Sequence, residues 1–181
     1  MAVKKITKRW IFNSLGVIIV ILIALEVAIS IAVKNYYYGS VERAVNSQAE
    51  TLSGLLSKYT SEGGGEYETY FRSLVSSFEK KNMMELMVLS DSGEVTITSS
   101  GFIPDSDILT PDCSEARTSL TGSSDFTGEM NEEKVLSLTT VAPNGTEAYN
   151  AFRLVTSLEK VDTQVAIVIA VTGVICIAII F

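Results

Sequence analysis

The sequence of 181 residues contains no histidine. A histidine general base, a histidine phosphoacceptor and a histidine-containing metal site are therefore excluded within it. Cysteine occurs only at Cys113 and Cys176, too few for a framework of disulfides. No nucleophile motif and no metal-ligand spacing stands out. We therefore expect no catalytic residue, no metal, no cofactor and no enzymatic activity from these residues.

Charge is almost absent from two long segments. Residues 11–33 contain one charged residue, Glu26, and residues 165–181 contain none. Twenty-three helical residues cross a hydrocarbon core of about 30 Å, and seventeen are at the short end for a span. A basic N-terminus before an apolar run also suits a signal peptide, but this run exceeds the usual apolar region and Lys34 follows it. The sequence thus predicts transmembrane helices over 11–33 and 165–181.

Basic residues set the expected orientation. Residues 1–10 contain four basic residues and no acidic one: Lys4, Lys5, Lys8 and Arg9. By the positive-inside rule this end stays in the cytoplasm. Residues 34–164 then form one extracytoplasmic domain, and residues 165–181 return through the membrane. We expect a multi-pass protein of the plasma membrane, with the lipid bilayer as its first partner.

Acidic residues are concentrated in the middle of the chain. Residues 35–162 hold 20 of the 21 acidic residues and 9 of the 14 basic ones, which leaves a net charge of −11. Such a surface argues against nucleic acid as a partner. It favours cationic ligands, or serves solubility alone.

Periodicity predicts an α+β domain. Apolar residues recur at helical spacing over 41–59 and again over 67–78. Short strands are expected at 86–89 and 95–98, and two more around the hairpin signal Asn144-Gly145. Residues 101–128 form a long polar stretch, in which a short helix is predicted at 114–120. We expect helices packed on an antiparallel sheet, a layered α+β arrangement.

The order of segments carries a resemblance. The stretches that carry it are "KKITKRWIFNSLGVIIVILIALEVAISI", "NYYYGSVERAVNSQAETL", "ELMVLSDSGEVTITSSGF" and "NAFRLVTSLEKVDTQVAIVIAV". Together they resemble the sensor region of bacterial two-component histidine kinases, in which an extracytoplasmic PAS-like (Cache-type) domain lies between two membrane helices. The resemblance implies a homodimer that detects an unknown small-molecule or protein signal. It also implies that the chain is the sensory half of such a kinase, cut before the kinase core.

Two groups of residues are candidates for signal relay. Ser157, Leu158, Val161 and Gln164 lie where the last strand would enter the second span, and residues 40–59 would enter the domain from the first span. Glu26 and Ser30 lie one turn apart inside the first span. An ionisable group in lipid usually faces a partner, so we expect either a helix–helix contact or a solitary Glu26 close to the membrane surface.

Ligand-binding residues are not evident from the sequence. Arg72, Arg117 and Arg153 are the cations suited to a carboxylate or phosphate, although each is expected to be an ordinary surface residue. Asp105, Asp107, Asp112 and Glu115 form an acidic cluster in the long polar stretch that is expected to be solvated. Two other functions stay open: a membrane-anchored structural or assembly protein of the cell envelope, and the sensor half of a chemoreceptor or nucleotide cyclase.

Overall fold

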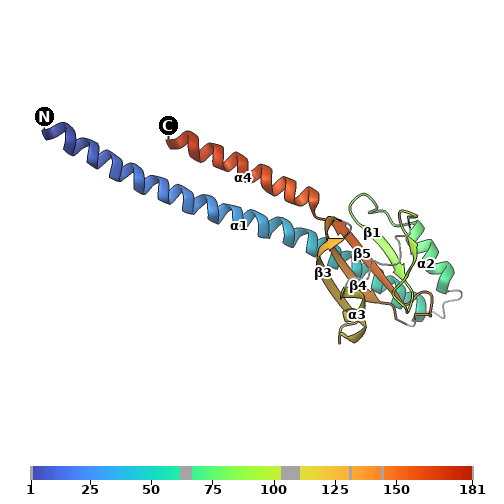
Figure 1. Ribbon diagram of the computed structural model, residues 1–181. Coiled ribbons are helices and arrows are strands. Elements are labelled where there is room, and N and C mark those ends of the chain that lie inside the picture. Colours follow the sequence, from blue (N-terminus) through green and yellow to red (C-terminus); the bar gives the residue numbers. More distant parts are fainter. Residues whose placement is uncertain (1, 62–66, 103–110, 131, 144, 181) are drawn as a thin grey trace. The chain divides into compact units, whose positions relative to one another are not determined.

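A computed structural model describes residues 2–61, 67–102, 111–130, 132–143 and 145–180. It contains four helices and five strands in the order α1, α2, β1, β2, α3, β3, β4, β5, α4 (Figure 1). Contacts divide the chain into two units, residues 1–40 with 160–181, and residues 41–159. Each unit is described by itself.

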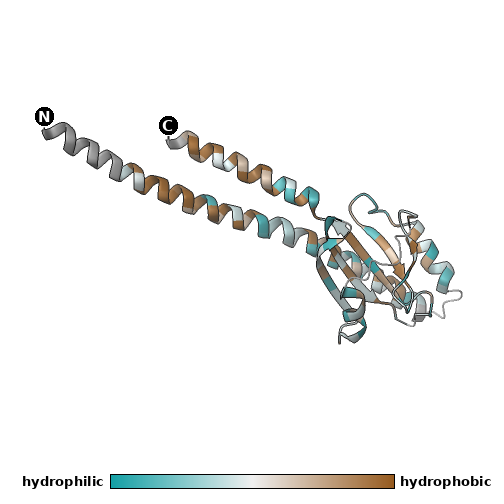
Figure 2. Ribbon diagram, viewed as in Figure 1, coloured by the Kyte–Doolittle hydropathy of each residue, from teal (hydrophilic) through white to brown (hydrophobic). Residues whose placement is uncertain are grey.

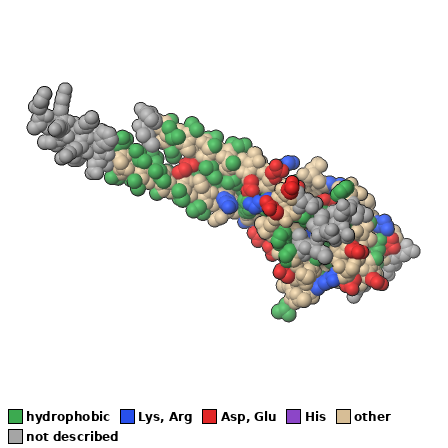
Figure 3. Space-filling model, in the orientation of Figure 1, with side chains coloured by type: hydrophobic (Ala, Val, Ile, Leu, Met, Phe, Trp, Pro, Cys, Tyr) green, Lys and Arg blue, Asp and Glu red, His purple; other side chains and the backbone are tan. Residues whose placement is uncertain are grey.

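The first unit consists of the N-terminal part of one long helix, up to residue 40, and most of a second helix. Helix α1 runs from Ala2 to Ser61 and helix α4 from Glu159 to Ile180, and both are long and apolar enough to cross a membrane (Figure 2). Hydrophobic side chains cover much of the visible surface of both helices (Figure 3). Helix α1 continues without interruption through Gly39. Helix α4 begins six residues before the expected span at Val165.

The second unit is built on one antiparallel sheet. Its strands are β1 (Glu85–Leu89), β2 (Val95–Thr98), β3 (Ser123–Met130), β4 (Glu133–Val141) and β5 (Ala151–Ser157). Their spatial order is β2-β1-β5-β4-β3, and every neighbouring pair is antiparallel. The predicted α+β class is confirmed. The last strand in sequence, β5, is the central strand of the sheet.

The connections differ from the expectation in two places. Strand β3 was expected to be loop, because its sequence SSDFTGEM is polar, and the structure shows an edge strand paired along β4. Strands β4 and β5 pair as predicted, but β4 ends at Val141 and β5 begins at Ala151. The hairpin predicted around Asn144-Gly145 is thus confirmed, with a connection of nine residues, and Asn144 itself lies outside the described residues. The short helix α3 (Pro111–Thr118) begins three residues before its expected start.

Alternation along the strands gives the sheet two different faces. Met87, Arg153 and Thr139 lie opposite one another across β1, β5 and β4, and so share one face. Asp112 from α3 covers that face through bonds to its polar side chains. The buried residues of the other face are apolar apart from Thr156: Leu86, Val88, Leu136, Leu138, Phe152 and Leu154.

Helices α1 and α2 (Tyr67–Ser76) cover this apolar face (Figure 1). The last turns of α1 contribute four buried residues, Val45, Ala49, Leu52 and Leu56, and α2 contributes Phe71 and Val75. The two helices are joined by stacked rings of Tyr59 and Tyr70, whose centroids are 3.9 Å apart. The Tyr70 hydroxyl also donates a hydrogen bond to the Leu55 carbonyl at 3.3 Å. The helical stripe that the sequence predicts over 41–59 is thus the core-facing side of α1.

Leu55 and Leu56 provide a matched test of this packing. The side chain of Leu56 is fully buried, whereas that of Leu55 is 45% exposed. Leu56→Ala should lower the free energy of unfolding by about 2–5 kcal/mol, because it leaves a cavity under the sheet. Leu55→Ala should cost about 1 kcal/mol or less. Denaturant unfolding of the full chain in detergent, followed by circular dichroism, measures both, and equal losses would contradict the assigned core.

Candidate functional site

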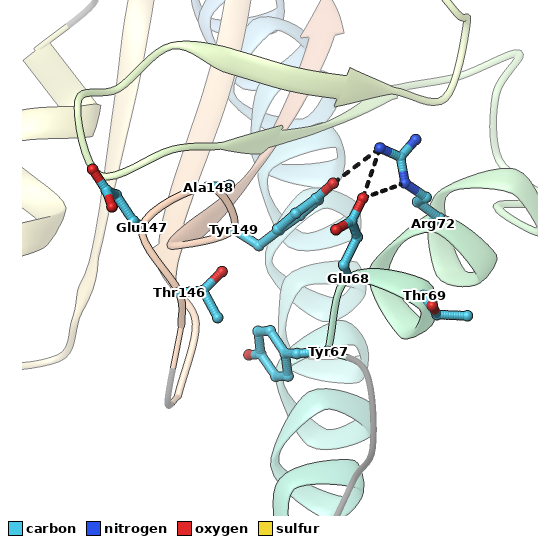
Figure 4. A pocket seen from close by; sticks show the side chains of 8 residues that line it. All are labelled: Tyr67, Glu68, Thr69, Arg72, Thr146, Glu147, Ala148 and Tyr149. Atoms are coloured by element: carbon cyan, nitrogen blue, oxygen red, sulfur yellow. Dashed lines mark hydrogen bonds and ion pairs between the residues drawn. The ribbon is translucent and has the colours of Figure 1, made fainter.

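A pocket lies between the start of α2 and the loop that joins β4 to β5 (Figure 4). It has a volume of about 760 Å³. From α2 it is lined by Tyr67, Glu68, Thr69 and Arg72, and from the loop by Thr146, Glu147, Ala148 and Tyr149. The wall therefore combines two phenol rings, two hydroxyl groups, two carboxylates and one guanidinium group.

A hydrogen-bonded cluster joins the two sides of the pocket. Arg72 Nε and Nη2 both lie 2.9 Å from Glu68 Oε1, and Arg72 Nη2 donates to the Tyr149 hydroxyl at 3.1 Å (Figure 4). One turn of α2 separates Glu68 from Arg72, which places both side chains on the same face of the helix. The ring of Tyr149 also packs against the ring of Phe71 on α2, with 5.9 Å between the ring centroids. The Tyr67 hydroxyl donates to the Pro143 carbonyl at 2.9 Å and closes the other end.

The cluster shifts the titration of its members. The hydrogen bond with Tyr149, and next the one with Arg72, lowers the pKa of Glu68. The bond to Glu68 raises the pKa of Arg72. Burial raises the pKa of both phenols, Tyr67 and Tyr149. At neutral pH the pocket therefore contains an ionised Glu68–Arg72 pair and two neutral phenols.

The side chains that line the pocket can bind a ligand reversibly. It offers donors and acceptors of both charges beside aromatic surface, which suits a small polar ligand. Among the residues that the structure describes, no group of three or more Cys, Asp or Glu could hold a metal ion. Of the three candidate arginines, Arg72 is the one that lines this pocket.

Arg153 corrects the expectation of a surface residue. It lies on the central strand β5, and its side chain is only 2% exposed. Its Nη2 donates to Asp112 Oδ1 at 2.7 Å and its Nε donates to Asp112 Oδ2 at 3.0 Å, a bidentate ion pair. Ser137 and Thr139 add hydroxyl donors to the same Oδ2, at 3.0 and 2.7 Å.

Asp112 is therefore not part of a solvated acidic loop, and that expectation is wrong for this residue; Asp105 and Asp107 lie outside the described residues. Its side chain is fully buried and receives four hydrogen bonds from β4 and β5. The sequence signal was the alternation of Ser137 and Thr139 in β4, which placed two hydroxyls on one face with Arg153. Since the bonds already satisfy the carboxylate, this cluster fastens α3 to the sheet and offers no open site.

Arg117 makes a third kind of contact. It is exposed on α3, and its Nη2 donates to the Ser90 carbonyl at 3.1 Å, so it ties α3 to the end of β1. The three arginines accordingly serve three different places, and the structure does not bring them into one site.

Glu26 makes a helix–helix contact within one chain. Thr172 Oγ1 of α4 donates to Glu26 Oε1 at 2.9 Å, and Cys176 Sγ lies 3.7 Å from Glu26 Oε2. The Ser30 hydroxyl donates to the backbone carbonyl of Glu26 at 2.8 Å, and so remains on α1. The contacts of Glu26 with α4 therefore do not involve the Ser30 side chain.

The proposed connector residues occupy the junction of β5 and α4. Ser157 ends β5, and Leu158 alone separates it from α4, which begins at Glu159. The Leu158 side chain is 1% exposed, and its amide donates to the Lys134 carbonyl of β4 at 2.8 Å. Val161 is buried and Gln164 exposed on the first turns of α4.

No family model matches the chain, and no curated protein is significantly similar to it. The function is therefore argued from residues and geometry.

The pocket cluster gives a pH-dependent prediction. In Tyr149→Phe the pKa of Glu68 should rise toward its ordinary value, because the largest cause of its lowering is removed. A lowered pKa stabilises the fold above the unfolded-state value of about 4.3, and this contribution is lost as pH falls through the folded-state value. The variant should therefore lose less stability on acidification than the parent.

NMR titration of the Glu68 carboxyl carbon measures this shift. Tyr67→Phe is the matched control, because Tyr67 bonds to Pro143 and not to Glu68. An unchanged Glu68 pKa in Tyr149→Phe would contradict the assigned network.

The buried ion pair gives a stability prediction. Asp112→Ala should lower the free energy of unfolding by about 3–5 kcal/mol, because Arg153 would remain charged and buried. Asp125→Ala, at an exposed carboxylate on β3, should change it by about 0.5 kcal/mol or less. The double variant Asp112→Leu with Arg153→Met should be more stable than Asp112→Ala. Equal effects of Asp112→Ala and Asp125→Ala in denaturant unfolding would show that the pair does not hold the fold.

Proposed function

We propose that the chain detects a signal outside the cell and passes it to the membrane, as the sensor region of a bacterial sensor histidine kinase does. The observation that carries this proposal is the junction at Leu158. The central strand of the sheet continues into an apolar helix with one residue between them, while α1 leads from the other apolar segment into the core without a break. A change of packing in the sheet thus has a short covalent route to both apolar helices.

Exposed apolar surface supports a membrane location for the two helices. Val20, Ile21 and Ile23 of α1 are 60–66% exposed, and Val174 of α4 is 66% exposed. Such a continuous apolar surface is unfavourable in water and favourable in lipid. The basic residues before α1 support a cytoplasmic N-terminus, with the sheet outside.

The layered domain supports the PAS-like (Cache-type) assignment. A five-stranded antiparallel sheet with the long N-terminal helix on one face and a short helix on the other fits the segment order on which the resemblance rests. We propose the pocket at Arg72 and Tyr149 as the place where the signal, a small polar molecule, binds. By the same resemblance the chain acts as a homodimer in the plasma membrane.

The proposed mechanism is a shift between two packings of the domain. The pocket is formed by α2 on one side and the β4–β5 loop on the other, so a ligand that contacts both fixes their separation. The loop leads directly into β5, and β5 leads into α4. A ligand can shift this equilibrium only by the difference between its affinities for the two packings.

Cysteine labelling tests the topology. In a Cys113→Ser, Cys176→Ser background, Glu94→Cys in the exposed β1–β2 turn should react with a membrane-impermeant maleimide in intact cells. Lys5→Cys should react only after the cells are permeabilised, because residues 1–10 are cytoplasmic in this proposal. Labelling of Lys5→Cys in intact cells, with Glu94→Cys protected, would contradict the proposed orientation.

A ligand screen separates sensing from a structural role in the cell envelope. Thermal unfolding of the full chain in nanodiscs, measured against a library of small polar metabolites, should reveal a compound that raises the Tm of the parent. Arg72→Ala should lose that rise, and Arg43→Ala, an exposed arginine of α1 outside the pocket, should retain it. A rise that survives in Arg72→Ala would place the ligand elsewhere, and no rise with any compound would favour the envelope protein.

A further inference from the structure

Helices α1 and α4 face each other along one stripe in the first unit. The less exposed residues recur every three or four positions on both helices: Ile19, Leu22, Glu26, Ile29 and Val33 on α1, and Val165, Ile169, Thr172 and Cys176 on α4. The remaining positions of these segments are mostly exposed and apolar. The stripe is therefore the shared interface of an antiparallel helix pair, and it is apolar except around Glu26.

Glu26 occupies the polar point of this interface. Both of its carboxylate oxygens are engaged, one by the Thr172 hydroxyl at 2.9 Å and the other by the Cys176 thiol at 3.7 Å. The single proton of the Thr172 hydroxyl is shared with the Val168 and Ile169 carbonyls, each at 3.0 Å. Gly173 lies between these two donors, and a Cβ there would be 3.8 Å from Glu26 Oε1. This is an ordinary van der Waals distance, so the carboxylate lies directly against the backbone of α4 at this position.

A second polar contact joins the same helices farther along. The Tyr38 hydroxyl donates to Asp162 Oδ1, and Lys34 Nζ lies 5.6 Å from the centre of the Tyr38 ring. Tyr38 lies 12 residues after Glu26 on α1, and Thr172 and Cys176 lie 10 and 14 residues after Asp162 on α4. The two contacts therefore belong to one antiparallel register. At about 1.5 Å per residue they are about 18 Å apart along the helix axis.

We propose that Glu26, with Thr172 and Cys176, is a hydrogen-bonded pin that fixes the axial register of α4 against α1 within one chain, and that Tyr38–Asp162 secures the outer end of the same register. This inference rests on the proposed function in that it takes both helices to lie in lipid. The pair then moves as one body, and the signal displaces the pair instead of sliding α4 along α1.

The physical basis is the lack of alternative partners in lipid. One turn before Thr172 on α4 is Val168, which offers no side-chain donor, and one turn before Cys176 is Thr172. Sliding α4 by one turn in that direction moves Thr172 to the place of Cys176 and leaves Glu26 with one donor instead of two, and no water replaces the lost donor in the hydrocarbon core. Interhelical hydrogen bonds in membranes change such populations by about threefold on average and by up to about twentyfold.

Disulfide cross-linking of the full chain in lipid nanodiscs measures the register. The background is Cys113→Ser with Cys176→Ser, which keeps a hydroxyl donor at position 176. Ile29→Cys is combined either with Ile169→Cys, which faces it in the proposed register, or with Val165→Cys, one turn away. The ratio of the two initial rates of oxidation reports how fully α4 occupies its register.

Glu26→Leu should lower this ratio at least threefold, and Thr172→Val should lower it in the same direction. Glu26→Gln should leave it within a factor of two, because the amide oxygen still accepts from Thr172. Val27→Leu, a lipid-facing neighbour, is the control and should have no effect. An unchanged ratio in Glu26→Leu, or an equal loss in Glu26→Gln, would overturn the pin.

A separate measurement distinguishes this failure from failure of the proposed function. Carbonate extraction of cell membranes reports whether the same variants are integral membrane proteins. Extraction of the parent chain as a soluble protein would remove the membrane assignment. Retention of the parent with an unchanged ratio in Glu26→Leu would overturn the pin alone.

Discussion

The structure depends on one constraint: the central strand of the sheet is also the strand that leads into the second apolar helix. Strand β5 bonds to β1 on one side and to β4 on the other, and Arg153 at its middle holds α3. Leu158 lies between the last residue of β5 and the first residue of α4, and its amide donates a hydrogen bond to the Lys134 carbonyl. The central strand of the sheet is thereby the one nearest, along the chain, to the proposed membrane span at α4.

Polar groups in this protein are buried where position has to be specified. The Asp112–Arg153 pair is costly to desolvate and adds little net stability over an apolar core. Its hydrogen bonds are satisfied in only one position of α3 on the sheet. Glu26 works in the same way between α1 and α4, in a region where apolar packing alone would tolerate sliding. In both places a carboxylate from one element is matched to several donors on another.

The elements with strong periodicity could be predicted from the sequence, and those without it could not. The stripe over 41–59, the strands β1 and β2 and the α+β class follow from the alternation of apolar and polar residues. Strand β3 could not be recognised, because an edge strand gains its stability from pairing with β4 and its own sequence is polar. The nine-residue connection between β4 and β5 was hidden by the Asn144-Gly145 signal, since a turn dipeptide also occurs inside longer loops.

The candidate site was less predictable, because it depends on pairs of residues far apart in the chain. Arg72 was recognisable as a cation, but its link to Tyr149 arises only when the loop before β5 folds against α2. The burial of Asp112 and Arg153 required the register of β4 and β5. Glu26 stood out because a charge in an apolar run is conspicuous, although its donors on α4 lie about 150 residues later.

The most direct test of the central claim is hydrogen exchange across the β5–α4 junction of the full chain in nanodiscs. The Leu158 amide is bonded to Lys134 and lies beneath a buried side chain, so it should exchange as slowly as the core amides of β5. That result would mean that the residue directly before α4 is held in the sheet. Exchange of Leu158 at the rate of an exposed loop would contradict the coupling on which the proposed function depends.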